Sequence, residues 1–447
     1  MSLPPEPSGG PVWQTFAWSF RPLAFLAHNR ERFGRAFSVR FIGFERPMVI
    51  VSDPAVIKAL YAERRHGLPP GRTFQLEPVL GSRSVLLLTG EEHVARRRLM
   101  LPPFHGERMR SYEAVMTEIA GAEIDSWPLG REFPIHTRMQ TVTLEVILRA
   151  VFGVAEGARL DRLRVLLRGL MADTGSPAMM LRALTARRLG SDPFAAVRER
   201  LAEVDEALFA EIAEHRLRPG LEQREDILSM LMSARFEDDT PMSDRELRDQ
   251  LMTLLLAGHE TTATALAWTF DLLLRHPAEL GRLRASLAAG EETYLKATIA
   301  ESLRLRPVVP LAGRRLAEDL VTDDLQLPAG TDVSPSIWLT HTDPELYPKP
   351  FAFRPERFLD SPPETYSWIP FGGGIRRCLG AAFAEFEMRV VLREVLGRVS
   401  LHKVDPRPER ATRRNVTLSP LAGTRVVVDS RRVSPAGSAV RAMKPPV

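Results

Sequence analysis

Residues 371–380 read Phe-Gly-Gly-Gly-Ile-Arg-Arg-Cys-Leu-Gly, and Cys378 in this stretch is the only cysteine of the 447-residue chain. A single thiol cannot form an internal disulfide or supply the several thiolates of a structural zinc or iron–sulfur site, so single-thiolate ligation is the metal chemistry left to it. The three glycines let the backbone bend and approach another group closely, while Arg376 and Arg377 favour the thiolate over the thiol. The stretch therefore predicts a loop that presents a thiolate to a metal.

The segment after this loop, residues 381–389, has the composition of a helix. Cys378 would then stand where a glycine loop enters a helix N-terminus, whose unpaired N–H groups stabilise a thiolate further. The alternative is a buried, unreactive cysteine beside an ordinary glycine loop.

The spacing Phe-Gly-x-Gly-x-Arg-x-Cys-x-Gly favours ligation, because it resembles the haem-binding loop of the cytochrome P450 family. The resemblance implies a haem b cofactor, iron protoporphyrin IX, with Cys378 as the metal ligand. It also implies that the fixed positions of the loop bind the cofactor: Phe371, Gly372, Arg376, Cys378 and Gly380.

Composition narrows the class of protein. Lys and Arg number 60 against 56 Asp and Glu, a net charge of only +4, which is too weak and dispersed to predict a nucleic-acid partner. The longest apolar candidate, residues 251–274, is interrupted by polar side chains and falls short of the ~20 continuous apolar residues of a membrane span. No signal peptide is evident in residues 1–20. We expect a cytoplasmic monomer without a membrane span.

A second motif lies inside a long predicted helix. Residues 243–246, Ser-Asp-Arg-Glu, have the spacing of a capping box, and an apolar run follows them. Residues 257–262 then read Ala-Gly-His-Glu-Thr-Thr, which breaks the apolar pattern. By itself this could be a buried helix with a glycine kink. The segment resembles the family's oxygen-activation helix, in which Ala257 and Gly258 would leave room for dioxygen, Glu260 would relay protons and Thr261 would hydrogen-bond the oxygen.

A third motif places His93 and Arg97 one turn apart on the predicted helix 91–98. A solvated basic helix is the plain alternative. The resemblance implies that both side chains bind the haem propionates, together with Arg314 and Arg376.

The pair Glu301 and Arg304 carries little information alone, since an acid and a base at this spacing usually form a weak surface pair. Its place between the second motif and the cysteine loop matches the Glu-x-x-Arg pair of the family. The resemblance implies a buried charge network of Glu301, Arg304 and Arg357 that supports the loop of Cys378.

The resemblance implies a substrate pocket lined by the oxygen helix, an extended segment and a hairpin tip near the C-terminal end, and the long loop at residues 66–84 is typical of a lid or ligand-contacting segment. The candidate pocket residues are Phe74, Leu76, Leu254, Val309, Leu311 and Val416. Because all are apolar, they favour a lipid, terpenoid, steroid or polyketide-like substrate without choosing among these classes.

The fold implied is mainly α, a single cytochrome P450 domain with a small β-sheet built from the hairpin at 36–51 and from residues 308–316 and 331–338. We assign residues 1–35 to an N-terminal extension and first helix, 36–430 to the haem-thiolate domain, and 431–447 to a disordered C-terminal tail.

The activity implied is that of a haem-thiolate monooxygenase that hydroxylates or epoxidises a hydrophobic small molecule. The chain carries no flavin or iron–sulfur pattern, so electrons would come from a ferredoxin or flavodoxin with its NAD(P)H reductase. The arginines at 96–98, 376 and 377 would help to form a basic docking face. Two alternatives remain: a peroxide-driven peroxygenase of the same fold, whose members typically lack an acid–alcohol pair such as Glu260–Thr261, and a non-catalytic haem-binding protein.

Overall fold

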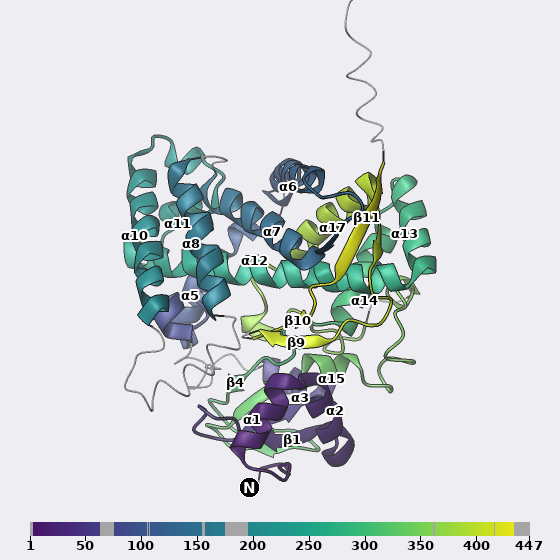
Figure 1. Ribbon diagram of the computed structural model, residues 1–447. Helices are drawn as coiled ribbons and strands as arrows, with labels where there is room; N and C mark the ends of the chain where they lie inside the picture. Colours follow the sequence, from purple (N-terminus) through teal and green to yellow (C-terminus); the bar gives the residue numbers. More distant parts are fainter. Residues whose placement is uncertain are drawn as a thin grey trace, which may run out of the picture.

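The computed structural model describes residues 3–62, 76–104, 106, 108–153, 157–174, 195–360, 363–414 and 416–432. Its helices are α1 Pro11–Phe20, α2 Pro22–Phe33, α3 Pro54–Ala62, α5 Gly90–Met100, α6 Arg108–Asp125, α7 Ile135–Phe152, α8 Ala158–Thr174, α10 Ala195–Leu217, α11 Ile227–Ser233, α12 Asp244–Arg275, α13 Pro277–Ala288, α14 Thr293–Leu305, α15 Ile337–His341, α16 Arg357–Asp360 and α17 Ala381–Arg398. Figure 1 shows α12 running through the middle of the helical part, with α7 and α17 against it.

The strands are short. They are β1 Ala36–Val39, β2 Met48–Val51, β3 Glu132–Pro134, β4 Arg314–Arg315, β5 Leu320–Val321, β6 Gln326–Leu327, β7 Asp332–Pro335, β8 Val399–Lys403, β9 Ala411–Arg414, β10 Thr417–Pro420 and β11 Arg425–Arg431. The largest sheet has the order β1-β2-β7-β4, with β2 parallel to β7 and the other pairs antiparallel. The mainly α fold with a small sheet, predicted as one domain, is confirmed.

Two strand predictions were too long. Residues 331–338 were expected to be a strand throughout, but β7 ends at Pro335. The hydroxyl of Ser336 accepts a hydrogen bond from the backbone N–H of Leu339 at 3.3 Å and so begins α15, which contains Trp338. Of residues 308–316, only Arg314 and Arg315 pair as a strand. In the predicted loop 66–84, residues 76–80 are helical, and residues 63–75 lie outside the described part.

The N-terminal end of α12 is fixed by the predicted capping box. The Ser243 hydroxyl accepts from the backbone N–H of Glu246, and the Glu246 carboxylate accepts from the backbone N–H of Ser243 at 2.9 Å. From there α12 continues for 32 residues, and most of its side chains are buried. The cap fixes where the helix begins, and α12 then carries the motif at 257–262 through the core.

Helix α7 packs closely along α12, at a glycine. A Cβ added at Gly258 would lie 3.3 Å from Cδ1 of Ile147, a contact tighter than most real side chains make. Gly258 therefore lets α7 approach α12. Its predicted role, leaving room for dioxygen, stays a prediction.

The N-terminal helices pack against strands of two sheets. α2 contacts β1, both α1 and α2 contact β9, and their aromatic side chains form a separate core cluster with Leu311 and Trp338. The domain limits at residues 35 and 430 stay predictions, and residues 433–447 of the proposed tail lie outside the described part. Among the described residues, no helix is long and apolar enough to cross a membrane.

Candidate functional site

The loop that carries Cys378 depends on glycine for its close approach to α3. Gly372 and Gly374 have φ of +67° and +62°, which non-glycine residues rarely adopt. A Cβ at Gly373 would lie 2.3 Å from the ring of Tyr61. The loop is closed by a hydrogen bond from the backbone N–H of Cys378 to the carbonyl of Phe371, at 2.9 Å. Gly380 then caps α17, so Cys378 lies just before a helix N-terminus, as predicted.

The thiol of Cys378 is accessible, yet its surroundings are dense. Burial raises the pKa of the thiol, while the backbone N–H of Gly380 and the charges of Arg97 and Arg377 oppose that rise. Cys378 therefore combines an exposed side chain with dense surroundings, as a residue that contacts a bound group would. Arg376, expected to act on the thiol, instead donates to the backbone carbonyl of Leu88.

Four cationic or imidazole side chains lie close to one another near the cysteine loop: His93, Arg97, Arg314 and Arg376. Burial and the charges of the three arginines lower the pKa of His93 to about 3. Burial, Arg314 and Arg97 likewise lower the pKa of Arg376 to about 10. Within the described ranges, neither Arg97 nor Arg314 forms an ion pair with a carboxylate. Arg314 is buried, while Arg97 and Arg376 are half-buried. Such a group of like charges is stabilised by an anion, and the two carboxylates of haem would fit this donor set.

Tyr61 extends this cluster and was missed in the sequence. Its side chain is buried and its hydroxyl has no hydrogen-bond partner in the described structure. Burial raises its pKa to about 12, and nearby Arg314 acts in the opposite direction. In a short apolar helix a tyrosine is typical of core, so no sequence signal marked it.

On α12, Thr261 and Glu260 face different surroundings. The Thr261 hydroxyl donates to the backbone carbonyl of Ala257 at 2.6 Å. Ala257 itself is exposed, although it lies midway along a helix that is otherwise mostly buried. This part of α12 therefore presents open surface, as contact with a bound cofactor or substrate would require.

The carboxylate of Glu260 contacts α7. Its Oε2 accepts a hydrogen bond from Nε2 of Gln140 at 2.6 Å, and its Oε1 lies 3.6 Å from Nε2 of His136. Burial raises the pKa of Glu260, against the lowering effects of Gln140, Arg414 and Thr264. Gln140 and His136 were not predicted, because residues 120 or more positions away cannot be paired from one sequence.

The predicted charge network is assembled and buried. Nε and Nη2 of Arg304 donate to the two carboxylate oxygens of Glu301 at 2.6 and 2.8 Å, and Arg357 donates to Oε1 at 3.1 Å. Nη1 of Arg304 also donates to the carbonyls of His341 and Pro350. These bonds connect α14 to the segment that leads into the cysteine loop.

The six candidate pocket residues are not brought together in one described cavity. Leu254 and Val309 join the largest apolar cluster, whereas Leu311 packs in the N-terminal cluster. Leu76 is half-buried, Val416 is 40% exposed, and Phe74 lies outside the described residues. Their contact with substrate stays a prediction.

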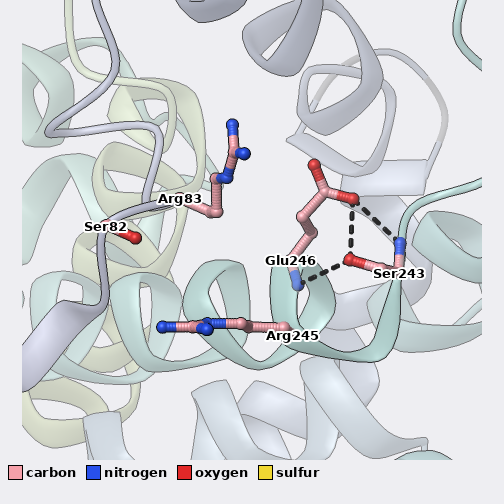
Figure 2. A pocket seen from close by; sticks show the side chains of 5 residues that line it. All are labelled: Ser82, Arg83, Ser243, Arg245 and Glu246. Atoms are coloured by element: carbon pink, nitrogen blue, oxygen red, sulfur yellow. Dashed lines mark hydrogen bonds between the residues drawn. The ribbon is translucent and has the colours of Figure 1, made fainter.

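A surface hollow of about 420 Å³ lies elsewhere, at the start of α12 (Figure 2). The residues that line it are Ser82, Arg83, Ser243, Arg245 and Glu246. The Glu246 carboxylate is already bound by Ser243 and Arg96, so the polar groups serve the helix cap. At 1.5 Å per residue, Glu246 is about 16 Å along the helix from Ala257. Cys378 is not among the residues that line this hollow.

Within the described ranges, no three His, Cys, Asp or Glu side chains gather into a metal site. A metal held by Cys378 would therefore need a cofactor that brings further metal ligands of its own. Haem would fit this requirement, since its porphyrin would hold the iron and Cys378 would supply the thiolate.

The chain is similar to known proteins over nearly its whole length. The family model described as Cytochrome P450 matches residues 4–424. A Mycobacterium tuberculosis protein named cytochrome P450 135B1 is 41% identical over 440 residues, which are 97% of this chain and 92% of that protein. Another from the same organism, named cytochrome P450 138, is 35% identical over 96% of this chain and 97% of that protein.

Solved structures show the same fold. The chain resembles the structure described as retinoic acid bound cyanobacterial CYP120A1 with a TM-score of 0.83 and 25% identity, covering 97% of this chain and 100% of that one. It resembles the cytochrome P450DA heme domain with a TM-score of 0.81 and 22% identity, covering 97% and 98% of the two chains.

Proposed function

The chain belongs to the cytochrome P450 family of haem-dependent monooxygenases, and from this premise we propose that it hydroxylates or epoxidises a hydrophobic small molecule with electrons from a separate redox protein. The observation that carries the proposal is the exposed Cys378 near three neighbouring arginines, of which Arg314 is buried. The thiol would ligate the haem iron, and His93, Arg97, Arg314 and Arg376 would bind its propionates.

When bound, the haem supplies the activation of dioxygen, and the thiolate raises the electron density at its iron. The protein's own part is to orient the substrate, exclude water and deliver protons. Glu260, partly buried on α12, would take up protons from solvent, and the hydroxyl of Thr261 would pass them to the reaction centre. To do so, the Thr261 hydroxyl must leave the Ala257 carbonyl, to which it donates at 2.6 Å.

The proposed substrate is apolar. Leu254 and Val309 come from different parts of the chain and pack in the same apolar cluster. The similar structure of CYP120A1 was solved with retinoic acid bound. A lipid, terpenoid, steroid or polyketide-like molecule stays the proposed class.

The proposed redox partner is a ferredoxin or flavodoxin with its NAD(P)H reductase. The expected docking face is smaller than the sequence indicated, because Arg96 and Arg98 form ion pairs with Glu246 and Glu237. Arg377 is exposed and lies next to Cys378, so it is the arginine best placed to contact an acidic partner. The monomeric state and the cytoplasmic location stay predictions.

The first experiment is the absorption spectrum of the reduced, carbon-monoxide-bound protein, compared with that of Cys378→Ser. A strongly red-shifted Soret band that is lost in the variant would establish thiolate ligation. A haem spectrum unaffected by the substitution would contradict the assignment of Cys378.

The second experiment separates the alternatives. NADPH and dioxygen consumed in stoichiometric amounts with product, in the presence of a ferredoxin and its reductase, would support the monooxygenase. Product formed only with hydrogen peroxide would identify a peroxygenase. Haem binding without product from a panel of apolar substrates under either condition would favour the non-catalytic haem-binding protein.

A further inference from the structure

The carboxylate of Glu260 is held from outside its own helix. Gln140 of α7 donates to one carboxylate oxygen at 2.6 Å, and the Nε2 atom of His136, one turn earlier on α7, lies 3.6 Å from the other. Gln140 and His136 lie on the same face of α7, since they are four residues apart. Both oxygens of the carboxylate therefore have a neighbour on α7.

His136 also connects Glu260 to the hairpin of β9 and β10. Its Nε2 atom lies 3.1 Å from the hydroxyl of Thr264, which lies one turn after Glu260 on α12. The Thr264 hydroxyl lies 3.4 Å from that of Ser419 in β10. Polar side chains of three elements thus meet at a buried point beside Glu260.

His136 is neutral in this environment. Its side chain is 3% exposed, and burial together with the charges of Arg414 and His259 lowers its pKa to about 3. A neutral imidazole carries one N–H and one free lone pair, so it can position a carboxylate or hydroxyl without forming an ion pair. The charged group that faces Glu260 is Arg414 of β9, which favours its ionised form.

We propose that Gln140 and His136 are positioning residues for Glu260, holding its carboxylate against α7 and setting how readily it takes up a proton for delivery to Thr261. This inference rests on the proposed monooxygenase activity for its catalytic meaning. The hydrogen bond from Gln140 stabilises the ionised carboxylate in a fixed orientation. The Thr264 hydroxyl also favours the ionised form, and His136 acts through Thr264, since its Nε2 atom lies 3.1 Å from that hydroxyl. Without these contacts the carboxylate is free to rotate and becomes easier to protonate.

The principal variant is Gln140→Met, which keeps the size of the side chain and removes the donor. Gln140 is only half-buried, so the substitution is compatible with folding. We expect product formed per NADPH to fall about fivefold, because one hydrogen bond to a charged group is lost, while the carbon-monoxide spectrum stays unchanged. The solvent isotope effect on product formation should rise, since proton delivery becomes slower.

A second pair of variants tests His136. His136→Leu removes both ring nitrogens and should uncouple NADPH use from product formation. His136→Gln keeps an N–H donor at similar length and should restore most of the coupling. A purely structural role would lower stability in both variants and would not distinguish them in coupling.

The matched control is Thr143→Val. Thr143 lies in the same helix interface and donates to the carbonyl of His259, but no hydrogen bond joins it to Glu260 in the described structure. This variant should keep the coupling of the unmodified protein. An equal loss of coupling in Thr143→Val and Gln140→Met would show that any disturbance of the α7–α12 interface is sufficient, and would overturn the proposal.

A readout independent of turnover uses the titration of Glu260 in the haem-loaded protein. The carbonyl stretch of the protonated carboxyl is followed by infrared difference spectroscopy and assigned with Glu260→Gln. In Gln140→Met the midpoint should shift upward, since a donor to the carboxylate is removed while Arg414 and Thr264 remain.

The coupling measurement and the infrared titration together distinguish a failure of the monooxygenase assignment from a failure of the positioning role. If the unmodified protein forms no product, the monooxygenase assignment fails, and the infrared midpoint still decides whether Gln140 positions Glu260. An unshifted midpoint in Gln140→Met, or unchanged coupling in an active protein, would overturn the positioning role.

Discussion

Arg304 and Glu301 form a two-bond ion pair in which neither side chain has any exposed surface. The remaining N–H groups of Arg304 donate to the backbone carbonyls of His341, Pro350 and Ala352. Every N–H group of the guanidinium therefore has an acceptor. A buried charge pair is stable only when the surrounding groups complete it in this way. The pair therefore acts as a clamp between α14 and the chain that approaches Cys378.

Replacing one residue of this clamp should strongly destabilise the folded protein. Glu301→Gln leaves the Arg304 charge buried and unpaired, which costs about 3–5 kcal/mol of folding stability. We expect a lower Tm and a lower yield of haem-loaded protein, measured by thermal unfolding and by haem content. The control is Arg407→Gln, since Arg407 is an exposed partner of Asp405 and its loss should leave the Tm unchanged. Equal effects of the two substitutions would contradict the clamp.

The folded protein should lose stability as the pH falls below neutrality. His341 accepts a hydrogen bond from the backbone N–H of Ile369 at Nε2, so it must be neutral, and its pKa is lowered to about 3, chiefly by burial. His136 and His259 are also buried, with pKa values lowered to about 3 and about 4.

The direction of this change in stability with pH follows from the lowered pKa values of the three histidines. A histidine with an unfolded pKa of about 6.5 takes up a proton only in the unfolded state between that pH and its folded pKa. Above about pH 6.5 the histidines do not lower the free energy of unfolding. Below that pH, each histidine lowers it by about 1.4 kcal/mol per pH unit. Denaturant unfolding from pH 7.5 to 4.5 measures this slope. A stability that stays constant down to pH 4.5 would contradict neutral burial of these side chains.

Much of the site could be predicted because its signals are local in the sequence. The loop of Cys378, the capping box of Ser243 and the Glu301–Arg304 pair each lie within ten residues, where spacing and residue type suffice. The contacts of Tyr61 and Gln140 could not, because each depends on elements far apart in the chain. The end of β7 was missed for another reason. The Ser336 side chain caps α15 and so ends the strand locally, and β propensity alone does not predict this cap.

The contact between Gly373 and Tyr61 should be testable by a pair of substitutions. Gly373→Ala places a Cβ 2.3 Å from the Tyr61 ring, so the loop or the ring must move. The backbone of Gly373 is extended, so the cost is steric alone. We expect a loss of stability that is smaller when Tyr61→Leu is already present, with a coupling of about 0.5–3 kcal/mol in a double-mutant cycle. Additive effects would mean that the two residues do not meet.

Replacing Arg314 should stabilise the haem-free protein but weaken haem retention in the haem-loaded protein. Arg314 is buried, and burial lowers its pKa, with Tyr61 opposing the shift. Arg314→Met removes a buried charge that has no carboxylate partner among the described residues, so the haem-free protein should gain about 1–3 kcal/mol. The haem-loaded protein should instead release haem faster to an acceptor such as apomyoglobin. A slower release, or a loss of stability without haem, would contradict the role of Arg314 as a propionate donor.

Thr261 and Thr262 provide a matched pair for testing proton delivery. Both hydroxyls donate to backbone carbonyls one turn earlier, Thr261 to Ala257 at 2.6 Å and Thr262 to Gly258 at 3.0 Å. Thr262 is buried, whereas Thr261 is partly exposed beside the exposed Ala257. We expect Thr261→Ala to lower product per NADPH about tenfold or more and to raise hydrogen peroxide release, because general acid–base groups typically contribute about 100-fold or more. Thr262→Ala removes an equivalent local bond and should change stability slightly but leave coupling intact. If both substitutions uncouple the enzyme equally, the effect belongs to the helix and not to the Thr261 hydroxyl.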